Sequence, residues 1–278
     1  MSIVDKALWV MERNSAQPLT LNSIAEACGV SRSHLANAFG TASGWPVMKY
    51  LKARRLTEAA KHLANGAPDI LTVALDHGYG SHEAFTRAFR DQFGLTPDQV
   101  RKNGSLEGLV VTPALRLKAA SCRPPTPRIR DLGSLRLVGS SAPCSYDSTV
   151  NIPAQWQQFV AEHCDEIPEK TKRIPIGVCR TPDEDGNFEY MCAVEVRSFT
   201  SKNRSLTYLE TDPRTYAVFQ HHDHVSTIFD TYLTIWNDAL PALARGVANA
   251  PCLEFHNAEF NPDTGYGGLE IWIPLESP

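Results

Sequence analysis

The fold of the first third of the chain is decided by the stretch Val73-Ala74-Leu75-Asp76-His77-Gly78-Tyr79-Gly80-Ser81-His82-Glu83-Ala84-Phe85-Thr86-Arg87-Ala88-Phe89. Gly78 permits the left-handed backbone of a tight turn, and Ser81 offers an N-cap for the helix that follows. Phe85 and Phe89 lie four residues apart, so they bury one face of that helix and leave the opposite face polar. The pattern is typical of a helix-turn-helix unit.

The same plan occurs once before, in the stretch Ile24-Ala25-Glu26-Ala27-Cys28-Gly29-Val30-Ser31-Arg32-Ser33-His34-Leu35-Ala36-Asn37-Ala38-Phe39. Both stretches have an apolar residue followed by alanine, a turn glycine, an apolar residue after it, a capping serine and a terminal phenylalanine. Further helices are predicted at 5–13, 46–64 and 97–101. The sequence therefore predicts an all-α domain with two helix-turn-helix units over residues 1–103.

The second helix of each unit carries the side chains that we expect to contact DNA. Arginine pairs with guanine and asparagine with adenine in the major groove, and Glu83 either accepts from cytosine or is solvated. Ala36 is short, so the first helix is expected to read fewer bases. Arg54 and Arg55 either contact phosphate or pair with acids nearby. The predicted DNA-binding residues are Arg32, Ser33, His34, Asn37, Arg54, Arg55, Ser81, His82, Glu83, Thr86 and Arg87.

The charge is divided unevenly along the chain. Residues 1–104 hold 12 basic and 9 acidic side chains, a net charge of +3, and residues 105–278 hold 15 and 22, a net charge of −7. The total of −4 therefore conceals a basic half, which suits a polyanionic partner such as double-stranded DNA.

The second half changes character after a Gly- and Pro-containing linker predicted at 104–127. Strands are predicted at 128–140, 174–181, 187–197, 214–221, 251–256 and 268–274, and helices at 153–164 and 225–243. This order is strand-helix-strand-strand, twice. We therefore expect an α+β domain of two such halves over residues 128–278.

The last predicted strand suggests a ligand site. Alternation sends Glu270 and Trp272 to one face and three aliphatic side chains to the other. A carboxylate beside an indole suits a flat, apolar, cationic ligand, through charge attraction and cation–π contact. The alternative for each aromatic residue is an ordinary place in the core. The predicted ligand-binding residues are Glu270, Trp272, Tyr190, Trp236, Tyr146 and Trp156.

The cysteines and histidines do not predict a metal site or cofactor. The 7 cysteines are dispersed, with no C-x-x-C pair, and fit reduced thiols in the cytoplasm. The run His221-His222-Asp223-His224 has no distant fourth ligand in the sequence, so metal binding there is the lesser alternative. No signal peptide and no membrane-spanning run is predicted.

Residues 5–102 resemble the DNA-binding domain of the AraC/XylS family. The resemblance rests on Tyr50-Leu51-Lys52-Ala53-Arg54-Arg55-Leu56 and on the run from Gly78 through Phe89 to Gly94-Leu95-Thr96-Pro97. It implies a rigid pair of units that read neighbouring segments of the major groove, about 34 Å apart.

Residues 128–275 resemble the GyrI-like effector-binding domain, through the runs 188–196, 216–219 and 269–275 and the helix with Tyr232 and Trp236. The arrangement is that of Rob-like regulators. It implies a transcription regulator, an activator that engages RNA polymerase and responds to a small-molecule effector at Glu270. Two alternatives remain: a hydrolase that uses Tyr190 with Glu270 as general base, and a protein-interaction module.

Overall fold

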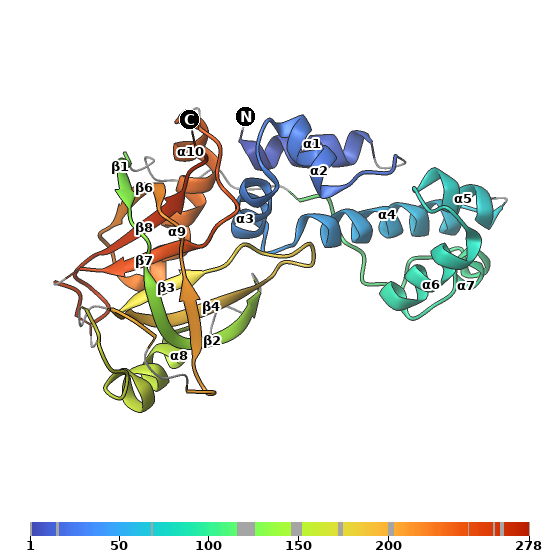
Figure 1. The fold of residues 1–278 in the computed structure, drawn as a ribbon. Coiled ribbons are helices and arrows are strands. Elements are labelled where there is room, and N and C mark those ends of the chain that lie inside the picture. The colour runs from blue at the N-terminus through green and yellow to red at the C-terminus, as the bar shows by residue number, and fades with distance from the viewer. Residues whose placement is uncertain are drawn as a thin grey trace.

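The computed structural model describes residues 2–14, 17–67, 69–115, 126–145, 152–171, 175–199, 203–243, 245–257, 259–261 and 264–277. Residues up to 115 form an elongated helical region, and residues from 126 form a sheet region at one end of it (Figure 1). No helix within these ranges is both long and apolar enough to cross a membrane.

The helical region has two small cores joined by one long helix, α4, with the second core at the end far from the sheet (Figure 1). The predicted fold class is confirmed, and the predicted helix bounds differ by a few residues at most. The helices are α1 (Ile3–Arg13), α2 (Leu21–Cys28), α3 (Arg32–Ser43), α4 (Val47–Ala64), α5 (Ile70–Asp76), α6 (His82–Phe93) and α7 (Pro97–Asn103).

In each helix-turn-helix unit, the predicted residues form the turn, the helix cap and the buried face. Gly29 and Gly78 have φ angles of 74° and 79°, the left-handed region in which glycine is favoured. Ser31 and Ser81 cap α3 and α6 through their side-chain oxygens. The phenylalanines and leucine predicted to face inward, Leu35, Phe39, Phe85 and Phe89, are completely buried.

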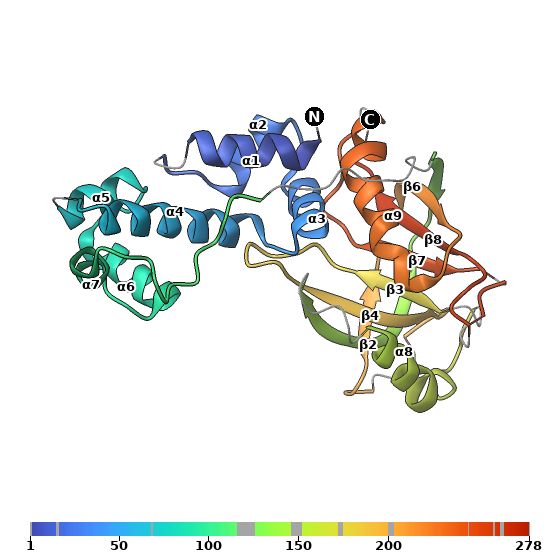
Figure 2. The same cartoon turned by 180° about the vertical axis from the view of Figure 1, so that it is seen from behind.

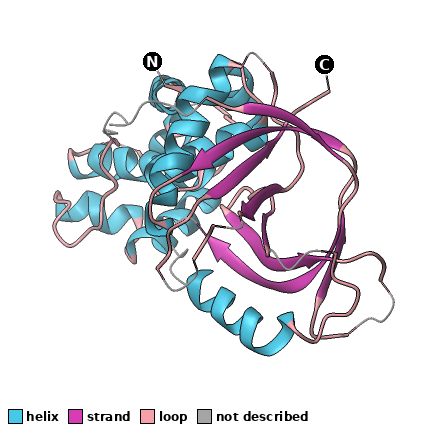
Figure 3. Cartoon of the chain, turned by 90° about the vertical axis from the view of Figure 1, so that its left-hand side faces the viewer, coloured by secondary structure: helices cyan, strands magenta, loops and turns pink. Residues whose placement is uncertain are grey.

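The sheet region is one antiparallel sheet, with eight strands in the described part of the chain, in the order β1-β6-β8-β7-β3-β4-β2-β5. It curves strongly upon itself (Figure 3). The strands are β1 (Arg128–Leu132), β2 (Arg136–Ser145), β3 (Ile176–Cys179), β4 (Asn187–Glu195), β5 (Thr207–Glu210), β6 (Arg214–His221), β7 (Cys252–His256) and β8 (Leu269–Pro274).

The strand order contains an exchange that the sequence did not predict. The predicted strand at 128–140 is two strands, and β5 was not predicted at all. Each half is preceded by its own extra strand, yet β1 pairs with β6 of the second half and β5 pairs with β2 of the first. The two halves therefore complete each other's edges around a pseudo-twofold axis between β7 and β3.

Helices cover one face of the sheet. The first half contributes α8 (Ile152–Phe159) with the π-helical η2 (Val160–Cys164). The second half contributes η3 (Val225–Thr227), α9 (Ile228–Thr234), the π-helical η4 (Ile235–Ala239) and α10 (Leu240–Ala242). In Figure 2, α9 lies beside α3, and the strands lie on its other side.

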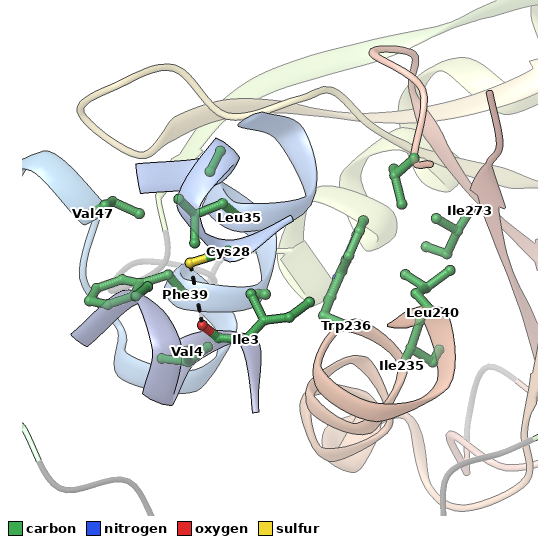
Figure 4. Close-up of a cluster of buried hydrophobic side chains, with 14 of the residues drawn as sticks. Ile3, Val4, Cys28, Leu35, Phe39, Val47, Ile235, Trp236, Leu240 and Ile273 are labelled. Atoms are coloured by element: carbon green, nitrogen blue, oxygen red, sulfur yellow. Dashed lines mark hydrogen bonds between the residues drawn. The ribbon is translucent and has the colours of Figure 1, made fainter. Parts of the chain in front are cut away.

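The helical and sheet regions share one buried apolar cluster. Trp236 of η4 is 2% exposed and lies between the side chains of the first helix-turn-helix unit and those of the sheet (Figure 4). The chain between the regions also packs, because Thr112 N donates to Thr57 Oγ1 of α4 and Leu115 N to Tyr50 Oη. Residues 116–125 of the predicted linker lie outside the described residues.

Candidate functional sites: the recognition helices and a buried carboxylate

The second recognition helix, α6, is open to solvent. His82, Glu83 and Arg87 are exposed, Thr86 is half-buried, and Ser81 forms the N-cap with its hydroxyl accepting from Ala84 N at 3.2 Å. The capped N-terminus and the buried aromatic face fix the helix on its core. The outward side chains can therefore meet base edges without rearrangement of the helix.

The first recognition helix, α3, is not open. The expectation of an exposed polar face is wrong for this arrangement of the two regions: Ser33 is 7% and His34 4% exposed. His34 Nε2 donates to Trp236 O at 2.7 Å, and burial lowers the pKa of His34, so the ring is neutral. Arg32 is half-exposed and forms an ion pair with Glu184 at 3.0 Å. The sequence of the helical region does not predict this burial, because the residues that contact α3 belong to the sheet region.

Of the two alternatives for the arginines of α4, Arg54 takes the pairing with acids, whereas Arg55 contacts a backbone carbonyl, so a phosphate contact by Arg55 stays a prediction. Arg54 is buried, and its Nε and Nη2 donate to both carboxylate oxygens of Glu12, at 2.8 and 3.0 Å. Its Nη1 lies 3.0 Å from Glu58 and donates to Thr112 O. Arg54 thus pairs with acids and ties α1, α4 and the following chain together. Arg55 is half-buried and donates to Gln17 O.

Glu270 and Trp272 lie on the face of the sheet away from the helices. Glu270 Oε1 accepts from Arg128 Nη2 at 2.7 Å and from Gln220 Nε2 at 2.6 Å, and its other oxygen accepts from the Trp272 indole at 3.0 Å. The adjacent arginine compensates this carboxylate. Glu270 is therefore not the uncompensated anion expected from the sequence of the last strand.

A different carboxylate, Glu254 of β7, is buried on the helix-covered face. It is 8% exposed, its Oε2 accepts from Tyr190 Oη at 2.6 Å, and its Oε1 accepts from Tyr232 Oη at 2.7 Å. Trp156 Nε1 in turn donates to Tyr190 Oη at 3.2 Å. Strands β4 and β7 and helices α8 and α9 thus converge on one charge.

The two tyrosines that donate to Glu254 are themselves protonated. Burial raises the pKa of Tyr190 and of Tyr232 well above the ordinary tyrosine value, with Glu254 adding to the shift, so both phenols remain protonated donors. Burial also lowers the pKa of the nearby His256, which is therefore neutral. No lysine or arginine pairs with Glu254 among the described residues.

The structure brings some predicted ligand residues together and separates others. Tyr190 and Trp156 lie at the Glu254 cluster, whereas Trp236 belongs to the contact with α3. Tyr146 lies outside the described residues. Sequence reasoning missed Glu254, although one signal was present: Cys252, Glu254 and His256 alternate with apolar residues in a strand that is otherwise core.

The histidine run has structural roles. His221 Nδ1 lies 2.8 Å from Thr231 Oγ1 and its Nε2 3.1 Å from His224 O, while His224 Nδ1 lies 2.7 Å from Ser226 Oγ. These bonds fix the turn before α9. Within the described ranges, no group of three His, Cys, Asp or Glu side chains is placed to hold a metal ion.

Two helix-turn-helix units joined to a two-half antiparallel sheet define a helix-turn-helix protein with an appended α+β domain. The model described as "Helix-turn-helix domain" matches residues 24–103, and that described as "GyrI-like small molecule binding domain" matches residues 125–276. The chain belongs to the AraC-type helix-turn-helix regulators that carry a GyrI-like domain.

Curated relatives match the helical region. Transcriptional regulator Rob of Salmonella typhimurium is 36% identical over 115 residues, 41% of this chain and 39% of that protein. Probable transcription factor PqrA of Proteus vulgaris is 36% identical over 96 residues, 34% of this chain and 77% of that protein. A solved structure, SAV2435 bound to tetraphenylphosphonium, has 21% identity and a TM-score of 0.43, and the match covers 54% of this chain and 94% of that one.

Proposed function

We propose that the protein is a sequence-specific DNA-binding transcription regulator whose sheet region binds a lipophilic aromatic cation at Glu254. The observation that carries the ligand class is the Glu254 carboxylate, which is buried, held by two neutral phenols and paired with no cation in the described chain. A buried charge of this kind is costly unless it is compensated.

The chemistry of the surrounding side chains supports that class. Tyr190, Tyr232 and Trp156 offer aromatic faces, and cations are attracted to such faces when both are desolvated. A cation that entered this cluster would gain the full attraction of Glu254, which the phenols satisfy only as dipoles. A ligand anion or a hydrophilic sugar would gain neither.

The DNA-binding part of the proposal rests on α6, whose exposed face carries His82, Glu83 and Arg87. Its capped N-terminus and buried opposite face are those of a helix that docks in the major groove. We extend the proposal to activation, in which the DNA-bound protein contacts RNA polymerase, on the basis of curated relatives such as the activator AarP of Providencia stuartii.

The ligand proposal is tested with tetraphenylphosphonium, a lipophilic cation with four aromatic rings, titrated into the full chain by calorimetry. Glu254→Gln keeps the shape of the side chain and removes its charge, and we expect affinity to fall by about 30-fold, from the loss of roughly 2 kcal/mol. The matched control is Glu270→Gln, which removes an equal charge from the opposite face of the sheet. An unchanged affinity in Glu254→Gln, or an equal loss in Glu270→Gln, contradicts the assignment.

A second candidate function for the sheet region is hydrolysis of a reactive small molecule. The 2.6 Å hydrogen bond between Tyr190 and Glu254 favours it, because a carboxylate that a phenol holds in place can accept a proton from water as a general base. Steady-state assays with activated esters and epoxides test this function. Turnover that disappears in Tyr190→Phe supports hydrolysis, and absence of turnover in the wild type leaves binding as the function.

A further inference from the structure

Three segments of the sheet region enclose the first turn of α3. Ser31 Oγ donates to Val247 O at 3.0 Å, and Ser33 Oγ donates to Asn249 Oδ1 at 3.4 Å. His34 packs on Trp236 with ring centroids 5.5 Å apart, in addition to the hydrogen bond between them. The tip of the β3–β4 hairpin completes the cover through the ion pair of Glu184 with Arg32.

The second unit provides an internal comparison for this cover. Aligned on their capping serines, Ser33 corresponds to Glu83 and Ala36 to Thr86. Ser33 and Ala36 are 7% exposed, while Glu83 is exposed and Thr86 half-buried. The difference arises from the sheet region, because the second unit lies far from it (Figure 1).

A recognition helix enters the major groove with its N-terminal residues against the bases, and the groove is about 12 Å wide. That width admits one helix and leaves no space for a hairpin and a loop packed on its first turn. DNA and the sheet region therefore compete for the same face of α3.

One helical segment connects this cover to the Glu254 cluster. Tyr232 of α9 donates its hydroxyl to Glu254, and Trp236, one turn later in η4, accepts the hydrogen bond from His34. A ligand that takes the place of the Tyr232 hydroxyl at Glu254 would displace the Tyr232 side chain, and a shift of α9 that accommodates it would carry Trp236 along.

We propose that the sheet region inhibits the first helix-turn-helix unit by covering α3, and that a cation at Glu254 releases α3 through α9 and η4. The release step rests on the function proposed above, whereas the inhibition does not. The ligand can act only through its different affinity for the covered and uncovered states, and DNA must then change ligand affinity by the same factor.

The inhibition is tested with a variant that pushes the hairpin away. Gly186 has φ +78°, and a Cβ at this residue would lie 2.4 Å from Pro46 Cγ, so Gly186→Asn forces the hairpin off the start of α4. The matched control is Gly108→Asn, with φ +81° and no atom within 4 Å of the new Cβ. Asparagine tolerates this backbone better than most residues, so both variants are expected to fold.

DNA for the measurement is selected from random duplexes of about 30 base pairs, long enough for two successive major grooves, with the full wild-type chain. We expect Gly186→Asn to bind the selected duplex at least about fivefold more tightly than wild type, since the competent fraction rises. Amide exchange should become faster in α3 and stay constant in α6. The inhibition is overturned if α3 exchanges at the same rate in Gly186→Asn and in wild type. It is also overturned if Gly186→Asn and Gly108→Asn bind the duplex with equal affinity.

A pair of less disruptive variants tests the inhibition if Gly186→Asn does not fold. Glu184→Gln removes the ion pair with Arg32, and Glu210→Gln removes a similarly exposed ion pair with Arg136 at the far edge of the sheet. Only Glu184→Gln should raise DNA affinity, by about twofold, the size expected for an exposed pair. No difference between the two variants counts against the inhibition.

The release step is tested with tetraphenylphosphonium on the wild type. We expect tetraphenylphosphonium to raise the affinity for DNA and the rate of amide exchange in α3. The selected duplex should in turn raise the affinity for tetraphenylphosphonium by the same factor as tetraphenylphosphonium raises the affinity for DNA. Binding without any effect on DNA affinity overturns release and leaves the ligand site standing. Absence of binding refutes the proposed ligand class and with it this release step, while the Gly186→Asn result still decides the inhibition.

Discussion

Gly177 lies directly against Glu254 across the β3–β7 pair, and its missing side chain makes the buried cluster possible. A Cβ at Gly177 would lie 2.8 Å from Glu254 Oε2 and 2.4 Å from Tyr190 Oη. The closeness of the phenol and the carboxylate therefore depends on a glycine in the strand between them.

Gly177→Ala should weaken cation binding at Glu254. The added methyl group pushes Tyr190 Oη and the carboxylate apart, and overpacking of this size costs about 1–3 kcal/mol, so we expect tetraphenylphosphonium affinity to fall about tenfold or more. Gly133→Ala is the control, because its Cβ meets nothing within 4 Å. Calorimetry measures the affinity, and equal affinities in the two variants would refute the role of Gly177.

Acid should loosen the contact between the two regions through His34. Burial lowers the pKa of His34 below its value of about 6.5 in the unfolded chain, so the unfolded chain binds more protons between the two pKa values. The stabilisation is complete above about pH 6.5 and falls as pH drops toward the folded pKa. His77 and His256 have lowered pKa values too and add to the loss.

The contribution of His34 is isolated by substitution. Urea unfolding of wild type, His34→Gln and the control His82→Gln, which changes an exposed histidine, is compared at about pH 7.5 and about pH 5.5. We expect the loss of unfolding free energy on acidification to be smaller in His34→Gln than in the other two proteins. Equal losses in all three proteins would show that His34 is not a titrating group of the contact.

The helical region was predictable from sequence because its information is local. Periodicity, capping serines and turn glycines placed the helices close to their observed bounds, and Phe85 and Phe89 are buried as expected. In the sheet region, β6 was predicted at its observed bounds, but the four-residue β5 is too short for a clear alternation. Its pairing with β2 joins the strand that precedes the second half to the first half, and no local sequence pattern predicts such a pairing.

The candidate sites were less predictable, because each depends on contacts between distant segments. Alternation correctly put Glu270 and Trp272 on one face, but the compensating Arg128 is 142 residues away. The alternation in β7 marks Glu254 as a polar residue in a core strand, but its role emerges when Tyr190 and Tyr232 converge on it from another strand and a helix. The cover on Ser33 and His34 comes from the sheet region and is invisible to any analysis of the helical region alone.

Arg54→Lys should destabilise the protein rather than weaken DNA contacts. Lysine cannot reproduce the two parallel hydrogen bonds to Glu12 together with those to Glu58 and Thr112 O, and we expect the free energy of unfolding to fall by about 2–3 kcal/mol. Arg101→Lys is the control, since Arg101 pairs with Asp98 on the surface, where such pairs contribute about 0.3–0.5 kcal/mol. Urea unfolding measures both, and equal effects would contradict a structural role for Arg54.

Arg87→Ala and Arg32→Ala should differ, although the two arginines lie on the recognition helices of equivalent units. Arg87 is exposed on the open helix α6, and we expect its loss to cost about 1–3 kcal/mol of specific DNA binding while the fold persists. Arg32 pairs with Glu184, so Arg32→Ala removes a DNA contact and also part of the cover on α3. These effects oppose each other, and the net loss of affinity in the wild-type background should be smaller than for Arg87→Ala.

Combining each arginine substitution with Gly186→Asn separates the two effects. Once the hairpin is displaced, Arg32 has only its DNA contact to lose, so Arg32→Ala should become more harmful in that background while Arg87→Ala stays the same. Arg90→Ala, an exposed arginine in the last turn of α6, controls for loss of positive charge. Gel-shift titration with the selected duplex measures the DNA affinity of the single and double variants, which together form a double-mutant cycle. A cost for Arg32→Ala that does not depend on Gly186 would mean that the hairpin contact does not restrict α3.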